Sequence, residues 1–273
     1  DAPIALFFRG NIPLNTLHIV SIVGTRHSTA YGLDICNTFI SYLSQLVPDV
    51  LIVSGLAYGI DIIAHRAALQ NNLNTIGVLA HGLDRIYPSA HRAVAIKMME
   101  QGGLLTEFMS ETNPDRQNFV KRNRIVAGMA DATIIVESAS RGGSLVTANI
   151  ANSYGRDCFT FPGRVTDTSS AGCHRLVRHH QAALITSAED FVEAMMWDAP
   201  QGSQAIQQSL FPILSEEESI IVGVLERYAE GTTINTLVAE TGFAVHRLSV
   251  VLFELELRNI VRPLVGSAYK LKK

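Results

Sequence analysis

The sequence is poor in the residues that build covalent or metal-bound scaffolds. Only three of its 273 residues are cysteines, and no two of them stand in C-x-x-C spacing. An odd number without that spacing indicates neither a disulfide framework nor a cysteine zinc site. The nine histidines form no H-E-x-x-H motif, and the adjacent His179 and His180 would point to different faces of a helix. We therefore expect ordinary thiols at Cys36, Cys158 and Cys173 and no bound metal.

Motifs for common cofactors and for hydrolysis are also missing. No G-x-G-x-x-G follows the first apolar run, and no G-x-x-x-x-G-K-S/T loop occurs, so NAD and ATP binding lack support. Ser54 lacks the strained G-x-S-x-G elbow of a nucleophilic serine. Asp61 precedes His65 by one helical turn, and it fits better as a carboxylate favoured at a helix start. We find no catalytic constellation and expect a non-enzymatic protein without a cofactor.

Long apolar runs and excess charge are absent too. No stretch approaches the roughly 18 apolar residues of a membrane span, and no charged-then-apolar leader opens the printed sequence. We therefore expect a cytoplasmic protein with no membrane partner. The net charge of −3 argues against a generally basic nucleic-acid binder. Residues 116–178 nevertheless hold nine Lys or Arg against four acids, a local charge of +5.

What is present is a regular alternation of apolar strand-like runs and helix-like stretches. Continuous Val, Ile and Leu runs between helices predict a parallel sheet covered on both faces, a Rossmann-like doubly wound α/β fold. The predicted strands are 18–24, 50–54, 75–80, 103–107, 133–137 and 157–161. The predicted helices are 31–46, 60–70, 91–101, 119–129 and 144–154. An entry segment, 1–17, precedes them.

Glycine-bearing loops follow five of these strands. They are 23–26, 54–61, 82–88, 138–147 and 161–164. In doubly wound sheets, ligands lie beyond the carboxyl ends of the strands, so the five loops should meet at one rim. Glycine lets the backbone approach a ligand, and the amides of the following helix can hold phosphate. Tight βα turns would explain any single glycine, but the convergence with Arg26 favours a binding site.

The stretch from Arg116 to Gly128 concentrates cations around one aromatic residue. Four cations lie within nine positions, with Phe119 among them: Arg116, Lys121, Arg122 and Arg124. A guanidinium grips phosphate and an aromatic face stacks a base, which is the chemistry that a single nucleic-acid strand requires. A solvated helix face with one core Phe is the alternative interpretation of this segment.

The last quarter of the chain predicts a separate module. Residues 201–210 are uncharged and low in apolar content, as is typical of a linker. We therefore divide the chain into a domain at 1–200, a linker at 201–214 and a domain at 215–273. Ser215 and Glu218 form a capping box before a helix at 220–228, followed by helices at 234–240 and 244–258 and a closing hairpin. This pattern predicts a winged helix. With seven Lys or Arg against eight acids, it favours a protein-contact or accessory role.

Several motifs, in order, resemble the DNA-processing protein A family (DprA, also called Smf). They are Val-Gly-Thr-Arg at 23–26, Ser-Gly-Leu-Ala-Tyr-Gly-Ile-Asp at 54–61, Gly-Leu-Asp at 82–84, Tyr-Pro at 87–88, Arg-Asn-Arg-Ile-Val-Ala-Gly at 122–128 and Gly-Ser-Leu-Val-Thr-Ala at 143–148. The resemblance extends over residues 4–195, and the last module is similar to the family's winged helix. Family members often begin with a helical domain, and the resemblance implies that this chain starts after it.

The resemblance implies a protein that binds single-stranded DNA taken up in natural transformation, protects it, and loads the RecA recombinase onto it. It also implies a homodimer formed through the Rossmann-like domain. Arg26 matches a phosphate-binding arginine of the family, Arg116 a pocket cation, and Phe119 a nearby aromatic. The expected DNA-binding residues are Gly24, Thr25, Arg26, Arg116, Phe119, Arg122, Asn123, Gly143 and Ser144.

Two departures and two alternatives accompany the resemblance. The chain has Gly142-Gly143 where the family usually has Ser-Gly, and His174 where it usually has Asn. A nucleotide or nucleoside hydrolase of the lysine-decarboxylase-like Rossmann group is one alternative, but its P-G-G-x-G-T-x-x-E motif lacks a match here. A transcription regulator with a ligand-sensing Rossmann-like domain is the other, and the acidic winged module disfavours it.

Overall fold

The six predicted strands all form, and they pair in one sheet. The computed structural model of the chain describes residues 1–197, 215–228, 231–258, 260–264 and 267–271. The sheet order is β1-β5-β4-β3-β2-β6-β7-β8, and every neighbouring pair is parallel except β1 with β5. The strands are β1 (Phe7–Gly10), β2 (Ile19–Val23), β3 (Leu51–Ser54), β4 (Thr75–Val78), β5 (Gly102–Thr106), β6 (Ala132–Ile135), β7 (Asp157–Thr160) and β8 (Ala183–Leu184).

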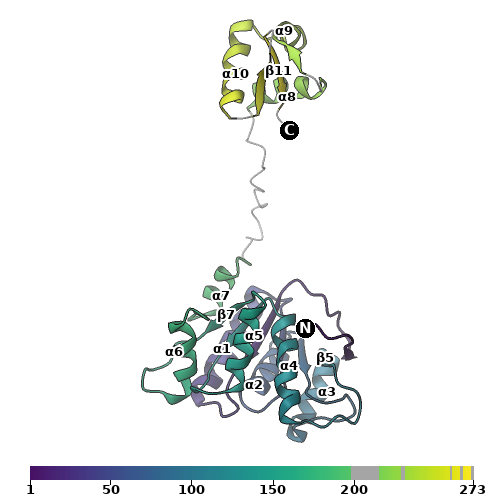
Figure 1. Cartoon of the computed structure of the whole chain (residues 1–273), viewed down its shortest axis with the longest axis vertical. Helices are drawn as coiled ribbons and strands as arrows, with labels where there is room; N and C mark the ends of the chain where they lie inside the picture. The colour runs from purple at the N-terminus through teal and green to yellow at the C-terminus, as the bar shows by residue number, and fades with distance from the viewer. Residues whose placement is uncertain (198–214, 229–230, 259, 265–266, 272–273) are drawn as a thin grey trace. The chain divides into compact units, whose positions relative to one another are not determined.

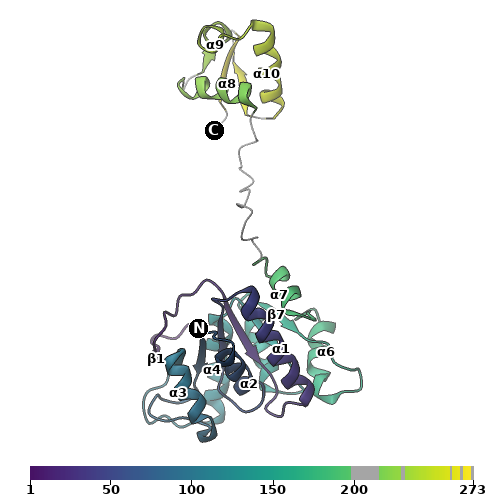
Figure 2. The same cartoon turned by 180° about the vertical axis from the view of Figure 1, so that it is seen from behind.

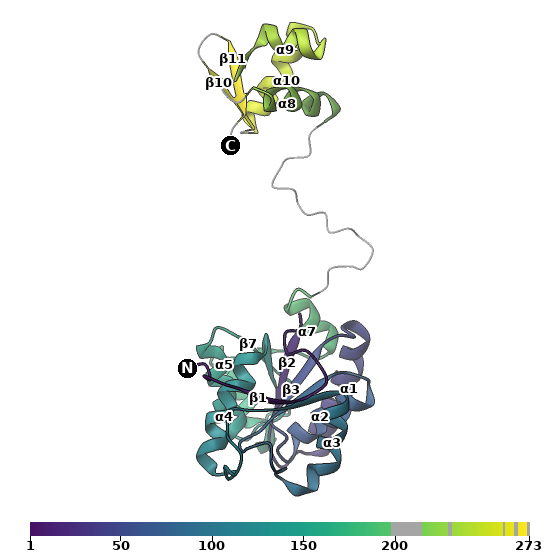
Figure 3. The ribbon, with the colours of Figure 1, turned by 90° about the vertical axis from the view of Figure 1, so that its right-hand side faces the viewer.

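Helices cover both faces of this sheet, as the continuous apolar strands predict (Figures 1–3). Successive strand residues serve opposite cores: Val20 and Ile22 pack with α1, α2 and α7, whereas Ile19 and Val23 pack with α4, α5 and α6. A smaller apolar cluster seats α3. The helices are α1 (Ala30–Leu46), α2 (Ile60–Gln70), α3 (Arg92–Glu100), α4 (Arg116–Met129), α5 (Gly143–Ser153), α6 (Ala171–Arg178) and α7 (Ala188–Ala194), with 3-10 turns η1 (Ser89–His91) and η2 (Thr168–Ser170).

The entry segment contributes a strand that the sequence pattern did not predict. β1 joins the sheet edge antiparallel to β5, with Phe8 opposite Leu105. Gly103 makes room for it, since a Cβ on Gly103 would lie 2.3 Å from the Phe8 ring. Four residues beside two prolines are too short for a period-two signal. The pairing of β1 at this edge of the sheet therefore depends on the close packing that glycine allows.

The strand order reverses between β2 and β6. From β2 the chain builds outward through β3, β4 and β5, and then returns to place β6 on the other side of β2. The loops after β2 and β6 consequently diverge to opposite faces and leave a crevice at their carboxyl ends. This crevice is where the fold favours a ligand.

The described part of the second unit starts at Ser215. Contacts divide the chain into residues 1–198 and 199–273, and residues 201–214 lie outside the described ones. The second unit has its own core and a three-stranded sheet, with the helices and hairpin of a winged helix. Its elements are α8 (Glu216–Glu226), β9 (Thr232–Thr233), α9 (Ile234–Thr241), α10 (Val245–Leu257), β10 (Val261–Leu264) and β11 (Ala268–Leu271).

The capping box predicted for α8 is present. The Ser215 hydroxyl accepts a hydrogen bond from the Glu218 amide at 3.2 Å, and the Glu218 carboxylate accepts one from the Ser215 amide at 2.7 Å. Across the described ranges no single helix is long and apolar enough to cross a membrane, although α9 and α10 together, bent by 111°, meet the length and composition for one.

Candidate nucleic-acid interface

One cavity of about 850 Å³ opens at the reversal of strand order. Its walls come from the loop after β2, the start of α2, helix α4, and the loop after β6 with the first turns of α5. All nine residues expected to bind DNA line it: Gly24, Thr25, Arg26, Arg116, Phe119, Arg122, Asn123, Gly143 and Ser144. Segments 24–26, 116–123 and 143–144 are distant in sequence, so only the fold brings them together.

Arginine dominates the charged groups of the cavity. Four arginines line it, Arg26, Arg116, Arg122 and Arg141, against one carboxylate, Asp61. Arg26, Arg116 and Arg141 are exposed to solvent, whereas Arg122 is 4% exposed. Three cations are therefore free to approach an anionic ligand from the rim.

Helix α4 begins at Arg116, three residues earlier than predicted. Asp115 is the N-cap residue but makes no side-chain cap bond, and the first turn holds no acid. A cation at the positive end of a helix is unfavourable unless an anion lies nearby. Arg116 and the free amides of this first turn together make a locally positive site that suits phosphate.

Arg122 is placed differently from a surface phosphate-binding arginine. Its Nη1 donates to the carbonyl of Gly55 at 2.7 Å and to the carbonyl of Val78, and its Nε donates to Asn123 Oδ1 at 3.3 Å. The guanidinium therefore connects α4 to the loop after β3 and to the last residue of β4. A Cβ on Gly55 would lie 2.4 Å from the guanidinium, which explains the glycine there.

Asp61 is the carboxylate of the cavity lining and is largely buried beside Arg122. It stands in the first turn of α2, as the sequence predicts, and accepts a hydrogen bond from the Gly55 amide at 3.2 Å. Burial raises the pKa of Asp61, and the charge of Arg122 opposes that effect. Burial lowers the pKa of Arg122 to about 10, so the guanidinium stays charged at neutral pH.

Phe119 presents an aromatic face between cations. The Cζ of Arg26 lies 5.1 Å from the ring centroid and that of Arg122 lies 5.9 Å from it. These distances fit cation–π contact. The helix face containing Phe119 is thus part of the cavity and not a solvated surface with one core residue. An aromatic surface next to exposed guanidiniums can stack a base while phosphate is held.

The α5 terminus contributes backbone groups. Gly142 is extended and precedes an 11-residue helix, and nothing lies within 4 Å of a Cβ built on Gly143. The Ser144 hydroxyl donates to Ser138 Oγ at 2.9 Å, and Ser144 is 6% exposed. Its side chain is therefore used within the protein, and the first amides of α5 are the groups available to a ligand.

Two of the five predicted loops do not line the cavity. The loop at 82–88 reaches it only through Tyr87, whose ring centroid lies 6.0 Å from that of Phe119. The loop at 161–164 is fixed elsewhere, since the Pro162 carbonyl accepts from the Tyr31 hydroxyl and the Gly163 carbonyl lies 3.0 Å from His174 Nε2. The replaced Asn position, His174, thus contacts that loop.

Arg141 and Thr147 line the cavity and were not among the predicted site residues. The sequence feature that could have identified them is their position next to Gly143, in the loop and in the first turn of the helix that follows. Of the basic window 116–178, Arg124 instead pairs with Glu107, and Arg156 lies 4.0 Å from Asp131 at the opposite ends of the strands. The three cysteines are free and buried, and the described residues contain no metal-like cluster of His, Cys, Asp and Glu.

Comparison with known proteins gives consistent matches. The DNA recombination-mediator protein A family model matches residues 1–196. Protein Smf of Escherichia coli is 34% identical over 280 residues, covering 100% of this chain and 73% of its own length. DprA of Streptococcus pneumoniae is 40% identical over 190 residues, covering 70% of this chain and 66% of that protein. A DprA of Mycobacterium tuberculosis matches over only 56% of its own length.

Solved structures agree. The DprA structure from S. pneumoniae has a TM-score of 0.66 at 39% identity, covering 71% of this chain and 66% of that one. The Helicobacter pylori DprA structure, described as showing a single-stranded DNA binding mode, has a TM-score of 0.66 at 32% identity, covering 72% of this chain and 89% of that one. With the family matched over residues 1–196, this chain belongs to the DNA recombination-mediator protein A (DprA/Smf) family.

Proposed function

We propose that the arginine-lined cavity binds single-stranded DNA. The observation that carries this proposal is the meeting of segments 24–26, 116–123 and 143–144 around one aromatic ring and three exposed arginines. A duplex hides its base faces, whereas a single strand offers both a charged backbone and free bases to such a cavity. The single-stranded DNA binding named for the H. pylori relative supports the same assignment.

In this proposal each group has a role. Arg26, Arg116, Arg141 and the first amides of α5 hold phosphate. Thr25 and Asn123 add hydrogen bonds, and Phe119 stacks a base. Gly24 and Gly143 let the strand approach the backbone. Arg122 supports the floor of the cavity through the Gly55 and Val78 carbonyls and stabilises the Phe119 ring from below. No step of bond making is involved.

We further propose that the protein protects incoming DNA during natural transformation and loads RecA onto it, acting as a homodimer through the Rossmann-like domain. Family membership supports this role. Sedimentation of the full chain would test the dimer. RecA's DNA-dependent ATP hydrolysis, with and without this protein, would test loading, and an unchanged rate would reject it.

The winged helix fits an accessory role and not the principal DNA site. On α10, Arg247 is held by Glu217 at 2.8 Å, and the exposed side chains include Val250 and Phe253. Glu254 is exposed on the same helix. An apolar and acidic helix offers few groups for phosphate.

The test compares a fluorescent single strand with a duplex of the same sequence. The parent should prefer the single strand, and Arg26→Ala or Arg116→Ala should each weaken binding about tenfold across all sequences. Arg156→Ala, which removes an arginine at the opposite ends of the strands, is the matched control and should bind as the parent does. Duplex preference that persists in both variants would move the site to the winged helix and reject the proposal.

A further inference from the structure

Two exposed tyrosines stand on the same rim as the cavity but outside its lining. Tyr58 is 49% exposed in the loop after β3, and Tyr87 is 46% exposed in the loop after β4. Within the described residues, neither hydroxyl has a hydrogen-bond partner. Exposing two large aromatic rings to water is unfavourable unless a ligand or partner covers them.

Both rings are next to groups of the cavity. Tyr87 lies 6.0 Å from Phe119, centroid to centroid, with the planes tilted by 59°. Tyr58 directly follows Ala57, which lines the cavity. Gly59, at φ +76°, packs so closely that a Cβ would lie 2.1 Å from the Thr25 carbonyl, so the Tyr58 loop is fastened against the Arg26 loop. The surface therefore continues from Phe119 over both tyrosines.

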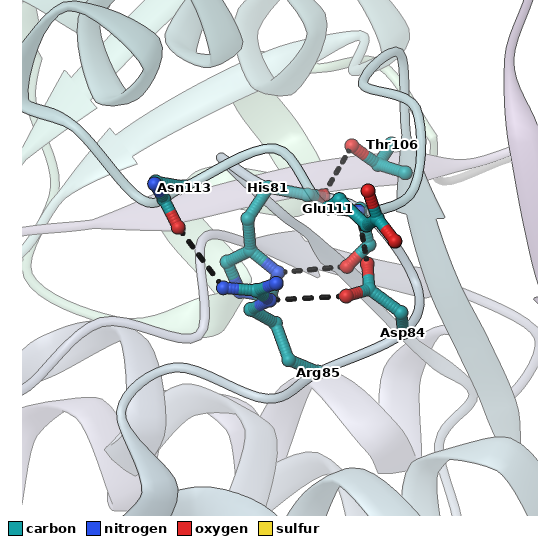
Figure 4. Close-up of polar contacts among 7 residues, drawn as sticks. His81, Asp84, Arg85, Thr106, Glu111 and Asn113 are labelled. Atoms are coloured by element: carbon teal, nitrogen blue, oxygen red, sulfur yellow. Dashed lines mark hydrogen bonds and ion pairs between the residues drawn. The ribbon is translucent and has the colours of Figure 1, made fainter.

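The loop that bears Tyr87 is held in place by a polar network (Figure 4). Arg85 Nε lies 3.0 Å from Asp84 Oδ2, and Arg85 Nη1 donates to Asn113 Oδ1 at 3.0 Å. The Glu111 amide donates to Asp84 Oδ1 at 3.1 Å, and the buried Thr106 hydroxyl donates to the His81 carbonyl at 2.8 Å. These hydrogen bonds join the loops after β4 and β5, so the backbone that bears Tyr87 is held in place.

Tyr58 rests on a buried support as well. Its ring meets that of His91 edge to face, at 4.9 Å between centroids and 70° between planes. His91 is 3% exposed, and its Nδ1 lies 2.8 Å from the Leu56 carbonyl. A ring fixed in this way loses little conformational entropy when a flat ligand stacks on it.

We propose that Tyr58 and Tyr87 form a second nucleobase-stacking subsite, so that a bound single strand leaves the cavity toward the β3 and β4 side of the rim. The inference rests on the proposed function, since it extends the same bound strand. The ligand class is a nucleobase because this part of the rim offers two exposed rings, while Arg85, the cation of the Tyr87 loop, is already engaged by Asp84 and Asn113.

The salt dependence of binding distinguishes a stacking subsite from the phosphate-binding cavity. Stacking on a neutral ring releases no counterions, whereas a phosphate contact does. Tyr58→Leu and Tyr87→Leu should each weaken binding of a long oligothymidylate roughly five- to tenfold and leave its salt dependence unchanged. Binding of a very short oligothymidylate, which fills the cavity alone, should stay at the parent value.

The experiment measures fluorescence anisotropy for oligothymidylates of increasing length at several salt concentrations. Tyr58→Phe and Tyr87→Phe retain the ring and should restore the gain in affinity with length. Tyr42→Leu is the matched control, because Tyr42 is 50% exposed but stands late in α1, at the other end of the sheet. Thermal unfolding of each variant shows whether it is folded.

The outcomes are distinct. Loss of the length-dependent gain in the leucine variants, with rescue by phenylalanine, supports the subsite. Leucine variants that gain affinity with length as the parent does would overturn it while leaving the cavity intact. A parent protein that binds no single strand at any length would overturn the proposed function and this inference with it.

Discussion

At the scale of single residues, burial decides which polar groups can meet a ligand. Arg26 and Arg122 are both arginines lining the same cavity, but Arg26 is exposed and Arg122 is 4% exposed with two main-chain carbonyls as acceptors. Removing Arg122 would leave those carbonyls and Asp61 without their partner, which costs stability before it affects binding. Two arginines of the same cavity thus have different roles.

His65, a fully buried residue of α2, predicts a pH dependence of stability. Thr75 Oγ1 donates to the Ile52 carbonyl at 3.0 Å, so His65 Nδ1, 2.7 Å from that oxygen, must be its donor. Nε2 is then unprotonated and has no partner. Burial lowers the pKa of His65 to about 3. The native state therefore binds fewer protons here than the unfolded chain.

The stability from neutral His65 is fully present above pH 6.5 and is lost as the pH falls toward 3, by about 1.4 kcal/mol per pH unit. His65→Leu should reduce the slope of the free energy of unfolding against pH by that amount between pH 6 and 4. Urea titrations monitored by Trp197, the only tryptophan, report on the first unit. His27→Leu, at an exposed histidine, is the control, and equal slopes in His65→Leu and parent would refute the expectation.

At the scale of elements, helix ends carry much of the local chemistry. The α4 and α5 termini both face the cavity without an acid in their first turns, whereas α8 is closed by its own capping box. Open ends offer amides to a ligand, and a capped end does not. This difference agrees with placing the single-strand site in the first unit.

The α8 cap should be measurable in the whole chain. Ser215→Ala removes the acceptor for the Glu218 amide and should destabilise the helix by about 1 kcal/mol. Hydrogen exchange of the α8 amides should then be about fivefold faster. Ser249→Ala is the matched control, because the Ser249 hydroxyl donates to the Val245 carbonyl inside α10 and caps nothing. Equal protection of α8 in Ser215→Ala and parent would show that the cap is dispensable.

At the scale of the whole molecule, the fold and not the basic stretch 116–178 decides where positive charge gathers. The net charge is −3, yet one rim gathers four arginines around a single buried carboxylate. Such a local field can attract a polyanion to an acidic protein. The two units have separate cores, so this field belongs to the first of them.

This gathering of positive charge predicts the salt dependence of binding. With three exposed arginines on phosphates, the logarithm of affinity for a single strand should fall with the logarithm of salt at a slope of about −2. Arg141→Gln should reduce that slope by about 0.7, as one contact is lost. Arg156→Gln should leave it unchanged. A parent slope near zero would mean that phosphate contacts do not carry the binding.

Apolar periodicity and glycine-bearing turns are local signals, so the amino-acid sequence was enough to predict the six central strands and the helices that alternate with them. It also placed residues such as Arg26 and Gly143 at strand ends, and the carboxyl-end rule then put them on one rim. The family motifs identified the same positions, and the match over residues 1–196 confirmed the family.

The neighbours of these residues, in contrast, follow from the three-dimensional fold. It paired β1 with the sheet edge, buried Arg122 under Phe119, sent Arg156 to the far end of the strands, and set Tyr87 beside the cavity. These outcomes depend on contacts between segments far apart in the chain, fixed by close packing and by hydrogen bonds that buried groups must find. Local periodicity carries no record of such partners.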